Sequence, residues 1–344
     1  MRAGIQKVSY MLIMIAACVF VTWNAGGTAS ADPIQISLSH TSSVESPWEK
    51  ASLKFAEIIN NGSNGKYKVS TFPNGVLVQK NWQIMIEMTQ AGSNQIGVES
   101  ITAFSSIVPE MANIQIPFLF NNDAHIAKFM ATNPPILQKW LKKYEEKKLV
   151  VLALAPRKFR QLINNKRMVK TPQDIEGLKF RVPNNPMFVD IFTLLGAKPV
   201  PMSSGEIYSA IQLGTVVGED NSISVVYDFK THEVAKYMTI WNYIADGSML
   251  LINKQLWDSM PPADKALFQK AAKEWVKVNR DIDETYQVKA IADMKKAGVI
   301  FYEMTDAEKV PFKKMIQPLY TKAKDRLGDA DYNAFMKAVE AAKK

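Results

Sequence analysis

The stretch GLKFRVPNNP, residues 177 to 186, has the pattern of a short strand that ends in a turn. Leu178, Phe180 and Val182 alternate with two cationic residues, as side chains on the two faces of a strand do. The second cationic residue, Arg181, stands almost at the end of the run, just before the Pro and Asn residues of the turn. An arginine on a strand usually faces solvent. Its place at the carboxyl end of a strand raises a second interpretation, a ligand contact, because open α/β sheets bind ligands there.

Strand-like and helix-like segments alternate throughout the chain. IQISLSH (34–40) alternates as a strand, and a helix is predicted to follow it, with Ser46 as N-cap and Pro47 at the first helical position. Further segments of this kind are KYKVSTF (66–72), KNWQIMIEMTQAG (80–92), QIGVES (95–100), AHIAKFMATNPPILQKWLKKYEEK (124–147) and LVVLALA (149–155). The alternation predicts an α/β fold with parallel-rich sheets that carry helices on both faces.

The longest helical signal runs from Pro261 to Gly298. It opens with a pair of prolines and closes at a glycine suited to the position after a helix. One continuous helix of this length would extend about 54 Å at 1.5 Å per residue, enough to cross two domains. Two helices with a kink near Asp281 to Asp283 would explain the same pattern.

The first 31 residues have the pattern of a secretory signal peptide. Arg2 and Lys7 precede an apolar stretch (8–23), and ASA at 29–31 is a small-residue cleavage site. The mature chain is therefore expected to begin near Asp32 and to be exported. Lipid attachment at Cys18 is the alternative, but the residues after this cysteine are apolar, whereas a lipidated cysteine normally precedes a polar tether.

Composition limits the classes of function. Cys18 is the only cysteine, so a chain cleaved after Ala31 has none and is stabilised by an ordinary core. Removal of Arg2 and Lys7 lowers the formal charge from +9 to +7. The cationic residues alternate with Asp and Glu on helical stretches, which is typical of solvated helix faces and not of a nucleic-acid-binding surface.

Motifs of catalysis and cofactor binding are missing from the sequence. His40, His125 and His232 have no metal-ligand spacing, and there is no GxGxxG, phosphate loop or GxSxG motif. We therefore predict no metal and no cofactor. Two adjacent acids, Glu219 and Asp220, are interpreted as solvated or capping groups of a loop. An exported α/β chain of this kind is better explained by binding than by catalysis.

Four segments, in order, resemble the dicarboxylate-binding (DctP-type) periplasmic solute-binding proteins of tripartite ATP-independent periplasmic (TRAP) transporters. They are NNKRMVKTPQDIEGLKFRVPNNP (164–186), GAKPVPMSSGEIYSAIQLGTVVGEDN (196–221), LLINKQLWDSMPPADK (250–265) and VPFKKMIQP (310–318). The resemblance implies a two-domain periplasmic-binding-protein fold, with mostly parallel mixed sheets, a long helix spanning both domains and a ligand cleft between them. The implied domain I comprises residues 32–157 plus about 247–286, and domain II comprises 158–246 plus about 287–344.

The resemblance also implies the site residues. The arginine that closes the GLKxRVP strand forms the principal salt bridge to a ligand carboxylate in that family, and it corresponds to Arg181. The other implied ligand-binding residues are Arg160, Asn184, Asn221, His40 and Glu99. Lys80 and Ser204, at positions where the chain departs from the family, are also expected to bind the ligand. Val217 replaces the first residue of the family's DGQEN motif, and Ser204 stands where many members have an aromatic residue. These departures leave C4-dicarboxylates, hydroxy or keto acids, sugar acids and sulfonates open as ligands.

The implied function is capture of a small organic anion by domain closure in the periplasm of a Gram-negative cell, and its delivery to the membrane permease subunits of the transporter. No enzymatic activity, nucleic-acid partner or stable membrane insertion of the mature chain is expected. Two alternatives stay open. One is an exported hydrolase that uses Glu99 with Glu219 or Asp220, and the other is a ligand-sensing module that serves a receptor.

Overall fold

The computed structural model describes residues 32–343. The predicted signal peptide (1–31), including the alternative lipidation site Cys18, lies outside the described residues. Within 32–343, no helix combines the length and the apolar character needed to cross a membrane.

One sheet of nine strands organises the described residues, with the order β2-β1-β3-β8-β4-β7-β5-β6 and with β9 paired to β8. The strands are β1 (Ile34–His40), β2 (Tyr67–Phe72), β3 (Ile96–Ser100), β4 (Leu149–Asn164), β5 (Lys179–Val182), β6 (Lys198–Pro201), β7 (Gly218–Asn221), β8 (Tyr237–Asn253) and β9 (Ile300–Glu303). Pairing is parallel for β1 with β2, β1 with β3, β5 with β6, β5 with β7 and β8 with β9. The predicted α/β fold with mostly parallel, mixed pairing is thereby confirmed.

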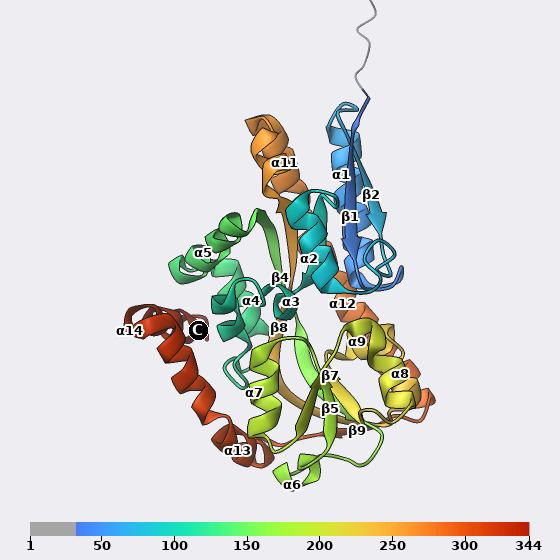
Figure 1. Cartoon of the computed structure of the whole chain (residues 1–344), viewed down its shortest axis with the longest axis vertical. Coiled ribbons are helices and arrows are strands. Elements are labelled where there is room, and N and C mark those ends of the chain that lie inside the picture. Colours follow the sequence, from blue (N-terminus) through green and yellow to red (C-terminus); the bar gives the residue numbers. More distant parts are fainter. Residues whose placement is uncertain (1–31, 344) are drawn as a thin grey trace, which may run out of the picture. The chain divides into compact units, whose positions relative to one another are not determined.

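The two longest strands, β4 and β8, form an antiparallel ladder that joins two groups of shorter strands (Figure 1). The first strand group, β1 to β3, attaches where β3 pairs with residues 248–252 of β8. The second strand group, β5 to β7, attaches where β7 pairs with residues 161–164 of β4. In the β4–β8 register, 149–155 of β4 face 248–253 of β8, whereas 162–164 face 237–239. The two groups therefore attach at opposite ends of the ladder.

Most helices lie between strands in the sequence, and the last two follow the final strand. They are α1 (Pro47–Gly62), α2 (Trp82–Ala91), α3 (Ile101–Phe104), α4 (Asp123–Thr132), α5 (Pro135–Lys142), α6 (Pro172–Ile175), α7 (Pro186–Leu194), α8 (Ile207–Gln212), α9 (Ile223–Asp228), α10 (Thr231–Val234), α11 (Lys254–Ser259), α12 (Pro262–Lys296), α13 (Asp306–Met315) and α14 (Gln317–Ala341). Three 3₁₀ segments complete the set, η1 (Pro109–Gln115), η2 (Lys143–Lys147) and η3 (Ser204–Glu206). The predicted cap of α1 is confirmed, because the Ser46 side chain accepts a hydrogen bond from Glu49 N and Pro47 is the first helical residue.

Helix α12 is a single helix of 35 residues, so the alternative of two helices with a kink is wrong. Phe268 and Trp275, in its first half, are buried in one apolar cluster with α1 and the first strand group. Ala290 and Met294, near its end, are buried in another cluster with α8 and α9. The helix therefore packs on elements that belong to both strand groups.

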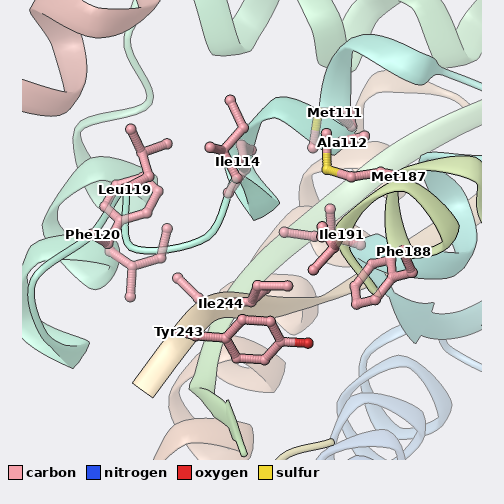
Figure 2. Packing of buried hydrophobic residues seen from close by; sticks show 14 of the residues in the cluster. Met111, Ala112, Ile114, Leu119, Phe120, Met187, Phe188, Ile191, Tyr243 and Ile244 are labelled. Carbon is pink, nitrogen blue, oxygen red and sulfur yellow. The ribbon is translucent and has the colours of Figure 1, made fainter. Parts of the chain in front are cut away.

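The largest apolar cluster also joins elements from different parts of the chain. It includes Met111 and Ile114 of η1, Met187 and Ile191 of α7, and Ile244 of β8, part of which Figure 2 shows. Burial of such side chains stabilises the fold by roughly 1.5 to 3 kcal/mol each. Residues before β4 thus share one core with the helix that follows β5.

Strand β4 differs from its prediction. The sequence pattern LVVLALA ends at Ala155, but the strand continues past Pro156 to Asn164. Irregular pairing with β8 between Val151 and Ala153, between Arg157 and Arg160, and between Arg160 and Leu162 accommodates this extension. A proline and three cationic residues interrupt the alternation of apolar side chains there, so the alternation does not predict this part of the strand.

Candidate ligand-binding cavity

A cavity lies where the two strand groups meet, with about 450 Å³ of empty space that includes part of the solvent at its mouth. We call it the central cavity; its lining residues are Thr41, Ser42, Trp48, Trp82, Glu99, Ser100, Thr102, Ala103, Arg157, Arg160, Arg181, Pro183, Ser204, Asn221, Val225 and Phe229. Strands β1 and β3 of the first group and β5 and β7 of the second end beside it. This is the position at which open α/β sheets bind ligands.

Arg181 is a buried cation in this cavity, with 3% of its surface exposed, so the interpretation as a solvent-facing arginine is wrong. Its Nε and Nη2 donate to Met202 O at 3.2 and 3.0 Å. Its nearest carboxylate oxygen, Glu219 Oε2, is 3.8 Å from Nη1, beyond hydrogen-bond distance. Burial lowers the pKa of Arg181 to about 10 in spite of this carboxylate. The surrounding protein therefore compensates the charge only in part.

Arg160 lines the same cavity but is fully paired. Its Nε donates to Asp220 Oδ2 at 2.6 Å, its Nη2 to Asp220 O at 2.6 Å, and its Nη1 to Asp246 Oδ2 at 3.4 Å. Burial lowers its pKa, but the Asp220 and Asp246 carboxylates more than offset this effect and raise the pKa overall. The guanidinium also lies over the ring of Phe188, 5.0 Å from its centroid. Arg160 thus has the contacts of a structural ion pair at the cavity wall.

Arg157 is a cavity residue that the sequence analysis missed. Its Nη2 donates to Ser222 Oγ at 3.2 Å, its Nη1 lies 3.4 Å from Asp246 Oδ2, and its guanidinium stacks on Trp48 at 4.9 Å from the ring centroid. Residues three apart on a regular strand point to opposite faces. The irregular pairing between Arg157 and Arg160 brings both into one cavity.

Glu99 is the carboxylate that lines the cavity directly. Its Oε2 accepts a hydrogen bond from Thr41 Oγ1 at 2.6 Å, and its Oε1 accepts from Ser100 N at 3.1 Å. Burial raises the pKa of Glu99 to about 7, and these two hydrogen bonds, with the charge of Arg157, oppose the rise. We therefore expect the Glu99 carboxyl, in the wall of the cavity, to change its protonation close to neutral pH.

Asn221 and Ser204 also reach the cavity, whereas Lys80 does not. Asn221 is buried at the end of β7 and donates to Glu219 Oε2 at 3.2 Å. Ser204 Oγ donates to Lys80 O at 3.4 Å, so the two residues meet at the rim. Lys80 is exposed and lines an outer hollow, which shares Thr41, Ser204 and Phe229 with the central cavity. The lysine is thus placed at the mouth.

Asn184 and His40 lie away from the lining of the central cavity. Asn184 Nδ2 donates to Gln83 Oε1 at 3.2 Å. His40 is completely buried, and its Nε2 lies 2.9 Å from Glu49 Oε2. The next residue, Asn185, caps α7 and also donates its Nδ2 to Thr102 O and Ser105 Oγ, both at 2.8 Å. Asn184 and Asn185 therefore connect the turn after β5 to helices next to the first strand group.

The interpretation of the acid pair Glu219 and Asp220 as solvated or capping groups of a loop is wrong. Both residues lie in strand β7 and are completely buried. Glu219 Oε1 accepts from Thr231 Oγ1 at 2.7 Å, and Asp220 Oδ2 accepts from Arg160 and from Tyr243 Oη, both at 2.6 Å. Neither residue lines the central cavity with Glu99. The described residues contain no group of three or more His, Cys, Asp or Glu side chains that could hold a metal ion.

This architecture, a cavity lined by buried cations between two strand groups joined by long strands, is that of a solute-binding protein. The chain belongs to the bacterial extracellular solute-binding protein family 7, the DctP family, whose model matches residues 38–326. A solute-binding protein of Verminephrobacter eiseniae is 32% identical over 276 residues, which are 80% of this chain and 81% of that protein.

Two further proteins are similar over nearly the whole chain. The C4-dicarboxylate-binding periplasmic protein DctP of Rhodobacter capsulatus is 29% identical, covering 91% of this chain and 93% of its own. The crystal structure of the sugar acid binding protein DctPAm of Advenella mimigardefordensis, in complex with galactonate, is 28% identical with a TM-score of 0.85, covering 90% of this chain and 99% of that chain. The family comprises binding proteins of transporters that work with membrane permease components, and the predicted resemblance is confirmed.

Proposed function

We propose that this chain is the periplasmic component of a TRAP transporter and captures a small organic anion, with the acidic group bound to Arg181. One observation supports this assignment above the others. Arg181 is a buried, cavity-lining guanidinium whose pKa is lowered by burial and whose nearest carboxylate lies outside hydrogen-bond distance. An arginine offers two parallel N–H donors to a carboxylate and keeps its charge when buried.

Arg181 alone gives modest affinity, since a charge-assisted hydrogen bond contributes roughly 1.5 to 3 kcal/mol. We assign the remaining contacts to Asn221, Arg157 and Ser204, which line the same cavity. Arg160 holds the wall in place through Asp220 and Asp246. We propose that the surroundings of the cavity, and not direct ligand contacts, are the place of Asn184, His40 and Lys80.

Closure of two domains around the ligand is part of the proposal. Domain I would comprise 32–157 plus about 247–286, and domain II 158–246 plus about 287–344. Ser43 N donates to Asp228 Oδ2 at 3.1 Å and Asn185 donates to Thr102 O, so the elements of both strand groups are in contact across the cavity. Such contacts would strengthen the Arg181 pair by excluding water and lowering the local dielectric. The closed form would then be what the permease recognises.

The experiment starts with the full chain, expressed so that it is exported, and with the processed protein purified from the periplasm. Mass spectrometry of small molecules released on denaturation identifies a retained ligand, and calorimetric titration of the refolded protein measures its affinity. The panel consists of D-galactonate, D-erythronate, succinate, L-malate and ethanesulfonate. Binding of an organic acid, with release of the same unaltered compound, supports the proposal. A folded protein that binds no member of the panel and releases no organic acid would overturn it.

A further inference from the structure

The rim of the central cavity carries a contact between the two strand groups. Ser204 Oγ donates to Lys80 O at 3.4 Å, and the next residue, Gly205, lies against the Lys80 side chain. All three residues line the outer hollow, and Ser204 lines the central cavity as well. Lys80 lies between β2 and α2, whereas Ser204 and Gly205 belong to η3, which follows β6. We call the meeting of these three residues the rim contact.

Gly205 allows the two sides of the rim to come this close. A Cβ atom at this position would lie 2.9 Å from Lys80 Cβ, well inside the contact distance of two carbon atoms. The three atoms nearest to it would all belong to Lys80. Lys80 Cβ is bonded directly to the backbone, so no change of side-chain rotamer can move it away. Gly205 has no positive φ angle, so its backbone would accept alanine if Lys80 were farther away.

The loop before α2 holds Lys80 in place. Gln79 and Lys80 both have positive φ angles, 52° and 56°, which residues other than glycine rarely adopt. Lys80 N donates to Gly75 O at 3.1 Å, and Gly75 N donates to His40 O at 2.9 Å, at the end of β1. Such a strained conformation persists only where the surrounding contacts impose it. Lys80 is therefore presented to η3 on a fixed backbone.

On the basis of the domain closure in the proposed function, we propose that the rim contact determines how fast the ligand leaves, and that it requires a residue without a side chain at Gly205. The ligand enters the open form before the rim contact exists, so the contact does not affect the association rate. After closure, Lys80 and Gly205 lie against each other and must separate before the ligand can leave. The contact therefore acts on the dissociation rate, which is where most differences in affinity between related complexes arise.

The first test measures association and dissociation rates by stopped-flow fluorescence, since Trp48 and Trp82 line the central cavity. The probe is the tightest-binding compound among D-galactonate, D-erythronate, succinate, L-malate and ethanesulfonate. Gly205→Ala should raise the dissociation rate by about tenfold or more and leave the association rate unchanged. Opening relieves the clash of the added methyl group, so the urea midpoint of the ligand-free protein should stay the same.

Lys80→Gly supplies the matched second change, because it removes the Cβ atom that the added methyl group would meet. When Gly205→Ala is combined with Lys80→Gly, the dissociation rate should return close to that of Lys80→Gly alone. Gly214→Ala is the control for stability. Gly214 has a φ angle of 76° and nothing within 4 Å of an added Cβ, so this variant should lower the urea midpoint and leave the dissociation rate unaltered.

A second test needs no ligand. The processed chain is expected to contain no cysteine, so Lys80→Cys with Gly205→Cys introduces a single pair. The Cβ distance is slightly shorter than in a disulfide, so a small outward shift allows the bond. We expect the reduced pair to form a disulfide on oxidation, and to form it faster when a bound probe favours closure. Mass spectrometry after alkylation of free thiols measures both rates.

The outcomes separate the two proposals. An unchanged dissociation rate in Gly205→Ala, or a raised rate that Lys80→Gly does not correct, would rule out the role of the rim contact while the protein remains an anion-binding protein. Failure of the cysteine pair to form a disulfide would rule it out as well, because the two residues then do not meet. If the folded wild-type protein binds no compound of the panel and releases no organic acid, the proposed function fails, and the role in ligand release fails with it.

Discussion

Arg181 Nη1 lies 3.8 Å from Glu219 Oε2, whereas Arg160 Nε lies 2.6 Å from Asp220 Oδ2 in the same wall. The difference separates two uses of a buried arginine. Arg160 donates hydrogen bonds to carboxylates of the protein, and its pKa is raised. Arg181 donates to a backbone carbonyl, and its pKa is lowered. A ligand anion would gain most beside the cation that the protein has compensated least.

Replacement of Arg181 by lysine should weaken ligand binding by about tenfold or more, because an ammonium group lacks the planar fork of donors. Calorimetric titration measures the change. Arg167→Lys is the matched control, since Arg167 is exposed after β4 and should leave affinity unaltered. Equal affinity in the Arg181→Lys protein and the wild type would contradict the assignment of the anchor.

Arg160→Met should act on stability and not only on binding. The substitution leaves Asp220 without a close cation in a buried wall and leaves Asp246 with Arg157 alone, which costs about 3 to 5 kcal/mol of unfolding free energy. Urea denaturation followed by circular dichroism measures this loss. Arg280→Met, at an exposed ion pair of α12, should change stability by no more than about 0.5 kcal/mol. A stable Arg160→Met protein that lacks only affinity would place Arg160 among the ligand contacts instead.

Glu99 should make stability depend on pH. Its pKa is raised from an ordinary 4.5 to about 7 in the folded protein, so the folded state holds a proton that the unfolded state has released. The unfolding free energy should therefore fall as pH rises from about 4.5 to about 7, by roughly 3 kcal/mol from this group.

Glu99→Gln isolates that contribution. Burial also raises the pKa of Glu219 and of Asp283, so the variant should retain part of the slope. Urea titrations at several pH values in both proteins give the difference between the two curves. Parallel curves across this window would show that Glu99 is ionised in the folded protein already at acidic pH.

Asn185 should control closure without touching the ligand. Asn185→Ala removes its hydrogen bonds to Thr102 O and Ser105 Oγ, as well as the cap of α7, which contributes about 1 kcal/mol. We expect a smaller closed fraction at saturating ligand, with Asn184→Ala as the milder control because Asn184 loses one exposed contact. Cysteines at exposed Leu53 and Leu213 in a chain that starts at Asp32 allow energy transfer between two dyes to report closure. Identical closed fractions in all three proteins would refute this role.

Local sequence signals predicted elements whose ends are fixed by neighbouring residues. Ser46 and Pro47 mark the start of α1, and the pattern after Pro261 marks α12, because caps and fixed proline dihedrals act within one turn of a helix. The position of Arg181 before a turn likewise indicated the end of a strand beside a cavity.

Other features depend on contacts between distant residues and left no local signal. A regular strand would place Arg157 and Arg160 on opposite faces. Irregular pairing of β4 with β8 brings both into the cavity instead. The sequence around Glu219 and Asp220 indicates a polar loop. Their burial depends on hydrogen-bond partners elsewhere in the chain, which are Thr231, Tyr243 and Arg160. Gly218 precedes them because a Cβ there would lie 2.0 Å from Ile163 O, and this close approach is visible only in three dimensions.

The unbroken helix α12 would restrict how the two proposed domains could move apart. It is anchored by Phe268 and Trp275 in one core and by Ala290 and Met294 in another. Bending it would break backbone hydrogen bonds, whereas a rotation whose axis passes near the helix leaves them intact. The proposed opening would therefore be a rotation about that side of the protein, in which atoms move farther the greater their distance from α12.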